Sequence, residues 1–262
     1  MDTVKRFVSQ SLLAGKAILG AFDLVQFICY QVGLTLLTLI FYCLLAFFTT
    51  GSYDLTRWVV GNSLVLSVNA CIFSLGTVFT SDRHFGRLRF IIASPMNLLA
   101  VILQKGVIAI LISLATVTGG FIASGLIFGV DFTGMNMGVF LLAALSATFS
   151  AAGMGLMMSA VALLTDSVHL ILNIVANMIL LLSGANFPIT QLPLVVQYLA
   201  KIFPLHRAVA AANMSRANFE LRSYLKLIIG ETILGICFYI VAFILLKIME
   251  RVAIKKASLE MF

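Results

Sequence analysis

Charged side chains are scarce in this chain. Asp, Glu, Lys and Arg together make up 10% of its 262 residues, and hydrophobic residues make up 61%. Soluble domains average about 25% charged and about 45–50% apolar residues, so a single water-soluble core could not bury this much apolar surface. The composition therefore predicts a membrane protein. It predicts an all-α one, because the apolar runs are long and a helical span needs about 20 mostly apolar residues.

The motifs of metal sites and enzymes are also missing. The four cysteines show no metal-ligand spacing such as CxxC and lie in apolar runs, so we interpret them as reduced packing residues. The three histidines are scattered, and neither HExxH nor GxSxG occurs. The GxxxxGK[ST] loop that binds nucleotide phosphates is absent too. We therefore expect no metal, no cofactor and no catalytic residue in this chain.

Six apolar runs are long enough to form transmembrane helices. They cover approximately residues 23–48, 58–79, 98–128, 137–163, 167–184 and 225–248. Ahead of them, residues 1–22 have an amphipathic pattern that favours a helix lying in the membrane interface, with an ordinary surface helix as the alternative. The sequence thus predicts one transmembrane domain over residues 1–262.

The positive charge predicts the orientation. The net charge is +7, but Lys and Arg lie between the apolar runs, so we expect no nucleic-acid partner. Eleven of the 17 basic residues fall on the side that holds both ends of the chain, and the other six fall opposite. Basic residues concentrate on the cytoplasmic side. We therefore predict that both ends of the chain are cytoplasmic.

The segment between the fifth and sixth runs, residues 184–208, breaks its helix repeatedly and stays apolar. Pro188, Pro193 and Pro204 lie here, and proline removes a helical hydrogen bond. A helix between the last two would be about 15 Å long, half a bilayer. This predicts a re-entrant helical hairpin on the extracytoplasmic side, with an interfacial loop as the alternative. The residues that mark this hairpin are Gly184, Phe187, Pro188, Pro193 and Pro204.

Residues 80–97 form the most charged internal loop. Phe85, Leu88 and Ile92 recur at helical spacing among arginines, which favours a short cytoplasmic helix that sits in a groove of a soluble partner. The alternative is a basic loop lying on anionic lipid.

Two stretches resemble one family. "FGRLRFIIASPMNLLAVILQK" is similar to the G-T-L-E-x-L-L-A-S-P stretch of the type-2 permeases of ATP-binding-cassette (ABC) exporters. "LLSGANFPITQLPLVVQYLAKIFPLHRAVAAAN" resembles their SG-x-x-F-P-x-x-x-L-P…P-L-x-x signature. With the six-span order, the resemblance covers essentially the whole chain. The chain departs from the family where Leu88 and Arg89 replace the common Leu-Glu, and it lacks the R-x-L-K-x-R-Y pattern of polysaccharide exporters.

The resemblance implies a mechanism. Two permease subunits, identical or similar, pair in the lipid membrane above two separate ABC ATPase subunits, which hold ATP and Mg. The hairpins form the outer gate, and the cargo is amphipathic: a drug, an antimicrobial peptide or a lipid. The alternatives are a glycolipid or polysaccharide exporter and an ATP-independent channel or carrier. The residues expected to couple to the ATPase are Asp82, Arg83, Phe85, Gly86, Arg87, Leu88, Arg89 and Pro95.

Polar side chains inside the runs are candidates for the pathway, because such side chains tend to face protein or water. In the resembled family the second and fifth spans border the central cavity. The alternative is hydrogen bonding between helices. The polar candidates are Gln31, Thr35, Asn62, Asn69, His169, Asn173 and Asn177, and Phe73 joins them because it falls on the same face of its run as Asn62 and Asn69.

Two further features concern packing. Glu231 lies near the outer end of the sixth run, where we interpret it as an interfacial anchor. The alternative is a charge pair with Lys226 or Arg222. The fourth run carries small residues at four-residue spacing, which predicts close helix packing. These are Ala147, Ala151, Gly155 and Ser159.

Overall fold

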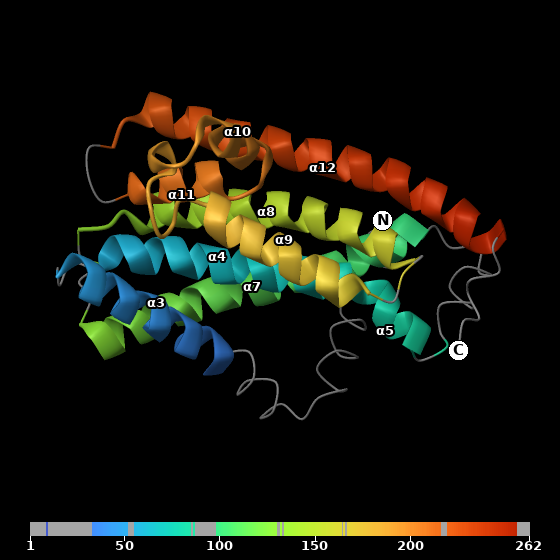
Figure 1. Ribbon diagram of the computed structural model, residues 1–262, viewed down its shortest axis with the longest axis horizontal. Helices are drawn as coiled ribbons and strands as arrows, with labels where there is room; N and C mark the ends of the chain where they lie inside the picture. Colours follow the sequence, from blue (N-terminus) through green and yellow to red (C-terminus); the bar gives the residue numbers. More distant parts are fainter. Residues whose placement is uncertain are drawn as a thin grey trace.

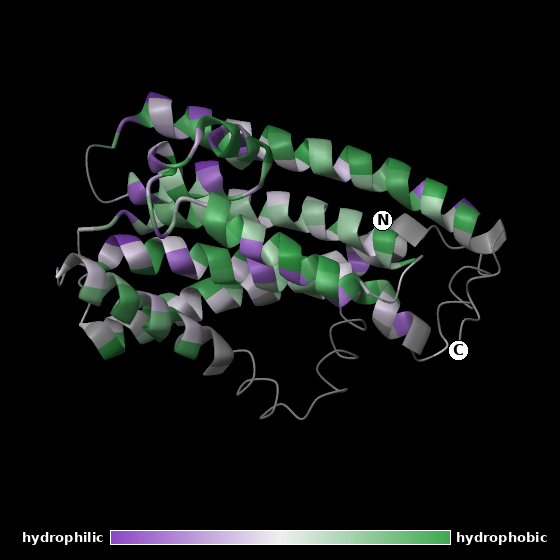
Figure 2. Cartoon of the chain, viewed as in Figure 1, coloured by the Kyte–Doolittle hydropathy of each residue, from purple (hydrophilic) through white to green (hydrophobic). Residues whose placement is uncertain are grey.

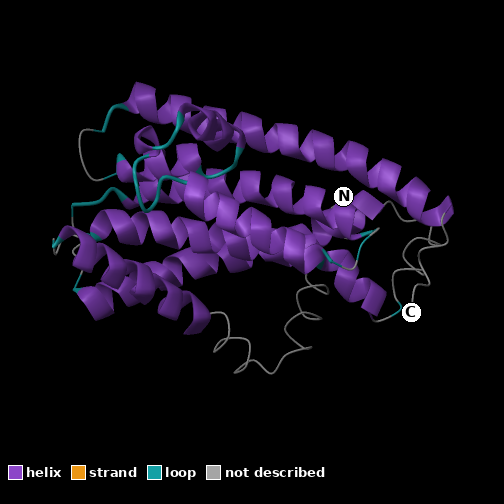
Figure 3. Ribbon diagram, in the orientation of Figure 1, coloured by secondary structure: helices purple, strands orange, loops and turns teal. Residues whose placement is uncertain are grey.

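The structure is a bundle of helices. The computed structural model describes residues 9, 33–51, 55–84, 86, 98–129, 132, 134–163, 165, 167–215 and 219–255. Within these ranges it contains helices and no strand, as Figure 3 shows. The predicted all-α class is confirmed for this part of the chain. The predicted interfacial helix falls almost entirely outside the described residues.

The long helices lie side by side along the longest axis of the molecule (Figure 1). A short 3-10 turn and two short helices interrupt their succession between the fifth and sixth long helices. In chain order the elements are α3 (Leu34–Thr50), α4 (Thr56–Gly76), α5 (Val78–His84), α7 (Leu98–Phe128), α8 (Met137–Ala162), α9 (Val168–Leu182), η2 (Ile189–Gln191), α10 (Leu194–Ile202), α11 (His206–Asn213) and α12 (Leu221–Lys255).

Helix α8 lies at the centre of the bundle, packed along α12 and α4. Asn136 starts it, because its side chain accepts from the N–H groups of the first turn. The predicted small-residue ridge on α8 is buried. An ideal Cβ on Gly155 would lie only 2.9 Å from Leu75 Cβ, and one on Gly153 only 2.9 Å from Phe238 Cβ. The small residues therefore let both neighbouring helices approach closely, as the sequence predicts.

Three of the described helices are long and apolar enough to cross a membrane: Thr56–Thr80, Met137–Ala162 and Leu221–Met249. The other three predicted runs hold shorter apolar helices, Leu37–Thr49, Ser113–Ile127 and Val168–Leu182. In Figure 2 much of α12 has the colour of hydrophobic residues, and several of its large apolar residues are exposed, among them Ile229, Ile233 and Ile240, which suits contact with lipid. The chain is a multi-pass membrane protein, and the count of six spans stays a prediction.

The connections alternate between the two ends of the bundle (Figure 1). One end holds α5, the turn between α8 and α9, and the last turns of α12. The other end holds the connections α3–α4 and α7–α8 and the segment between α9 and α12. Successive long helices of the described part therefore run in alternating directions.

The proline-rich segment folds as short pieces. Gly184 directly follows Ser183, the C-cap residue of α9, and has φ 75°, a conformation that glycine adopts without steric cost. Pro188 precedes η2, and Pro193 precedes the nine-residue α10. The predicted short helix before Pro204 is therefore present. Its depth in a membrane stays a prediction.

Candidate functional site

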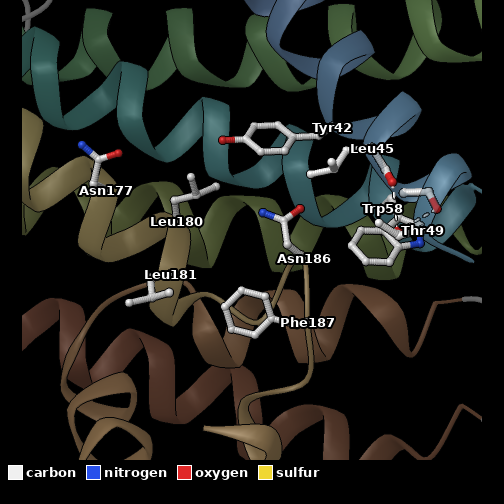
Figure 4. A pocket seen from close by; sticks show the side chains of 10 residues that line it. Tyr42, Leu45, Thr49, Trp58, Asn177, Leu180, Leu181, Asn186 and Phe187 are labelled. Carbon is white, nitrogen blue, oxygen red and sulfur yellow. Dashed lines mark hydrogen bonds between the residues drawn. The ribbon is translucent and has the colours of Figure 1, made fainter.

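A cavity of about 520 Å³ lies between α3, α4, α9 and the loop that follows α9. Its size is that of a small-molecule site. Figure 4 shows aliphatic, aromatic and amide side chains around it. The lining residues are Tyr42, Leu45, Ala46, Thr49, Trp58, Asn177, Leu180, Leu181, Asn186 and Phe187.

Helical spacing explains the wall on α3. Tyr42, Leu45, Ala46 and Thr49 stand at i, i+3, i+4 and i+7, so they share one face of the helix. The Thr49 hydroxyl donates to the carbonyl oxygen of Leu45 over 2.9 Å and is thus already engaged. Among the residues that the structure describes, no charged one belongs to the lining. The wall can therefore hold an apolar body and offer a few uncharged polar contacts.

An amide pair fastens the loop after α9 to α4. Asn62 is fully buried, and its Nδ2 donates to Asn186 Oδ1 over 2.9 Å and to the Trp58 carbonyl oxygen over 3.0 Å. Beside it, an ideal Cβ on Gly61 would lie 2.8 Å from Ala185 Cβ, so the loop lies directly on the helix. Asn62 does not line the cavity itself. It fixes a residue that does.

The predicted pathway residues are only partly brought together. Asn177 lines the cavity. His169 and Asn173 are exposed on α9, and Asn173 Nδ2 donates to the His169 carbonyl oxygen over 2.7 Å. Asn69 and Phe73 are half-buried on α4, outside the lining. The side chain of Thr35 is not described, and Gln31 lies outside the described residues.

The predicted gate residues lie in one segment with different exposures. Phe187 lines the cavity (Figure 4). Pro188 and Pro193 are exposed, and Pro204 is buried. The side chain of Ile189 lies against Gly184, 3.3 Å from its ideal Cβ position. The segment thus contributes part of the cavity wall at one of its ends only.

The predicted coupling residues are described only in part. Asp82 is buried on α5, a helix that packs against α8, and Gly86 has φ 66°. The side chain of Arg83 is not described. The others lie outside the described residues: Phe85, Arg87, Leu88, Arg89 and Pro95. The structure therefore places the start of residues 80–97 on the central bundle, and their coupling role stays a prediction.

Our interpretation of Glu231 as an interfacial anchor is wrong. Its side chain has no exposed surface, and its Oε1 accepts from the Ser150 hydroxyl and from the Leu205 N–H. The hydrogen bonds explain how a carboxylate is tolerated inside the bundle. A carboxylate within a long apolar run was the signal that could have found it.

Sequence reasoning also missed Trp58, Tyr42 and Asn186 as lining residues. Trp58 is the single tryptophan of the chain, and it stands in the first turn of α4, where aromatic side chains are usually taken as interface anchors.

Among the described residues, no three His, Cys, Asp or Glu side chains gather where they could hold a metal ion.

A protein-family model described as "ABC-2 type transporter" matches residues 22–219. The match covers about three quarters of the chain and includes the cavity, α8 and the proline-rich segment. A search of curated proteins finds no match.

Proposed function

The chain belongs to the ABC-2 type transporter family, and from this premise we propose that it is the membrane subunit of an ATP-driven exporter. It moves an amphipathic cargo (a drug, an antimicrobial peptide or a lipid) outward across a bacterial cytoplasmic membrane. The family match over residues 22–219 carries the proposal. Domains of this family transport rather than catalyse, so the energy comes from separate ABC ATPase subunits that bind ATP and Mg.

The cavity supports an amphipathic cargo. Its volume of about 520 Å³ admits a drug-sized body or one lipid chain. Asn177 and Asn186 offer uncharged hydrogen-bonding groups, and Trp58 and Phe187 offer flat apolar surface. The described part of the lining disfavours a cargo with a buried ionic group, because none of its side chains is charged and could compensate that group.

The proline-rich segment, residues 184–208, serves as the outer gate in this proposal. Phe187 belongs to the segment and to the cavity wall, and Asn186 is fastened to α4. A displacement of the segment must therefore change the cavity. We propose that it lies at membrane depth as a re-entrant hairpin, which its apolar α10 supports.

The ATPase couples through residues 80–97. Asp82 on α5 is buried, and this helix packs against α8. A force applied to the loop from the cytoplasm would therefore reach the central helices. A second permease subunit, identical or similar, completes the pathway. Exposed apolar residues on α3, among them Leu37, Phe41 and Phe48, are available to that subunit or to lipid.

The experiment is purification of the tagged chain in mild detergent, followed by mass spectrometry of proteins that co-elute in stoichiometric amount. We expect a soluble protein with a phosphate-binding loop, and the purified complex in vesicles should move a fluorescent amphipathic dye only with ATP and Mg. Elution without an ATPase, even after crosslinking, would refute the proposal in favour of an ATP-independent channel or carrier. Movement of the dye in the opposite direction would refute export.

A further inference from the structure

One bend carries the proline-rich segment back into the bundle. Leu205, directly after Pro204, joins α10 to α11 with φ 90° and ψ −33°. Among the described residues, all others with a positive φ are glycines. A residue with a side chain adopts such a conformation only where its surroundings impose it. The Leu205 side chain is fully buried, so the constraint comes from inside the bundle.

Glu231 on α12 makes the polar contact at this bend. The Leu205 N–H donates to Glu231 Oε1 over 2.8 Å. The Ser150 hydroxyl of α8 donates to the same oxygen over 2.5 Å. A single buried carboxylate oxygen therefore joins three elements: α8, α12 and the returning end of the segment. The contact lies at the opposite end of the segment from the amide pair that fastens it to α4.

If this carboxylate were removed, the Ser150 hydroxyl would keep a hydrogen-bond acceptor and the Leu205 N–H would lose its own. The Ser150 hydroxyl also lies 3.0 Å from the Ala147 carbonyl oxygen in its own helix, so it keeps an acceptor. The Leu205 N–H has Glu231 as its acceptor within the part of the chain that the structure describes. A buried N–H without an acceptor is strongly disfavoured. Loss of the carboxylate therefore affects the bend and leaves α8 largely intact.

Arg207 supplies a compensating charge. An ideal Cβ on Gly230 would lie 3.0 Å from Arg207 Cδ and 3.2 Å from its Nε, so the arginine side chain rests on α12 beside Glu231. Its positive charge attracts the carboxylate. Glu231 Oε2 and Arg207 Nη1 are both buried without a hydrogen-bond partner among the described residues. Both hydrogen bonds to the Glu231 carboxylate therefore go to Oε1. A substitution that keeps this acceptor but removes the charge can distinguish the effect of the hydrogen bond from the effect of the charge.

We propose that Glu231 is a positioning residue for the outer gate. Its carboxylate holds the Leu205 bend and thereby fixes the returning end of the segment against α8 and α12. This inference rests on the proposed function, because it treats the segment as the gate of a transport pathway. The hydrogen-bond acceptor at Oε1 is the required group, and the negative charge is secondary.

The test measures gate opening without any ATPase or cargo. In the full chain, reconstituted in vesicles with its four cysteines replaced, Ala200→Cys is the reporter. Ala200 is fully buried on α10. The probe is a maleimide that cannot cross membranes. Ala144→Cys, at a fully buried position of α8, is the matched control for general loosening.

We expect Glu231→Leu to accelerate labelling of the reporter by about tenfold or more, while the control position stays protected. Glu231→Gln keeps a side-chain oxygen that accepts from Leu205, so its labelling rate should stay within about threefold of the parent rate. Glu231→Asp keeps the charge but withdraws the oxygen by one methylene. It should accelerate labelling even if the leucine variant fails to fold.

Unchanged labelling in both the Leu and the Asp variants would overturn the proposal. Equal acceleration by Gln and Leu would overturn the hydrogen bond as its cause, and parallel labelling at the control position would reduce Glu231 to a general stabiliser of the fold. Failure of the proposed function is separate. The proposed function would fail if the labelling rates changed as expected but ATP-driven dye movement was unaltered in Glu231→Leu. It would also fail if the labelling rates changed as expected but the parent did not move the dye at all.

Discussion

Replacing Gly155 by alanine tests the close contact between α4 and α8, the helix at the centre of the bundle. An ideal Cβ at this position would lie 2.9 Å from Leu75 Cβ and 3.3 Å from Ile72 Cα. Both atoms are fixed to the α4 backbone, and no rotamer change moves them away. The helices must therefore separate by a few tenths of an ångström, and overpacking of this kind destabilises by about 1–3 kcal/mol.

Gly119→Ala on α7 is the matched control, because nothing lies within 4 Å of its ideal Cβ. Both substitutions gain the same helix propensity, about 1 kcal/mol, so the difference between the two variants isolates the collision at Gly155. For a chain of this size 1 kcal/mol shifts Tm by about 2–4 °C. We therefore expect the Tm of Gly155→Ala to lie about 2–12 °C below that of Gly119→Ala, when unfolding in detergent is measured by circular dichroism. Equal Tm values would refute the close α4–α8 contact.

Trp58 is the single tryptophan and lines the cavity, so an amphipathic dye should quench its fluorescence saturably. A linear, unsaturable quench would argue against the cavity as the cargo site. Burial, followed by the nearby positive charges, lowers the pKa of His206. Below about pH 6.5 the unfolded state therefore binds a proton that the folded state does not, and Tm should fall with pH. His206→Gln should reduce the decrease of Tm at low pH. If Tm depended on pH as steeply in this variant as in the parent, His206 would not be its cause. Phe85→Asp combined with Leu88→Asp should release the ATPase from residues 80–97 in a pull-down while the permease still folds. Undiminished ATPase in the eluate would contradict the coupling role.

The sequence predicts those features that depend on local geometry. Ala147 and Gly155 share one helix face at multiples of four residues, and a face made of small residues packs closely wherever it meets another helix. Pro188 and Pro193 break the helix for a covalent reason that no tertiary contact can remove. The short pieces η2 and α10 follow from the same positions.

Long-range pairings could not be predicted in this way. Asn62 and Asn186 are 124 residues apart, and Ser150 and Glu231 are 81 apart. Helical spacing shows that polar residues share a face but not what that face meets. On α9, the amide of Asn173 bonds to its own helix backbone on the exposed side. The environment of Glu231 depends on where the proline-rich segment returns, which a span-by-span interpretation leaves open.

The helix breaks explain why the apolar proline-rich segment contains side chains with amide and hydroxyl groups. Each break in a helix leaves backbone groups that need partners in an apolar setting. The Ser183 hydroxyl accepts from the Ala185 N–H over 3.2 Å, and Gln197 Nε2 donates to the Leu192 carbonyl oxygen over 2.8 Å. These side chains satisfy the segment's own backbone. Asn186 differs from them, because it lines the cavity while its oxygen accepts from Asn62.

Asn62 holds Asn186 in the cavity wall through this hydrogen bond, although Asn62 does not line the cavity itself. Asn62→Leu keeps the branched shape and the number of side-chain heavy atoms but removes the donor that fixes Asn186. A hydrogen bond between helices in a membrane contributes about 0.6–2 kcal/mol, so cargo binding measured by Trp58 fluorescence should weaken by about 3–30-fold as the wall loses its preorganisation. Asn69→Leu, two turns along the same helix and outside the lining, is the control and should bind like the parent. If both variants bind alike, the amide pair does not shape the cavity, and the loop after α9 is held by its contact with Gly61 alone.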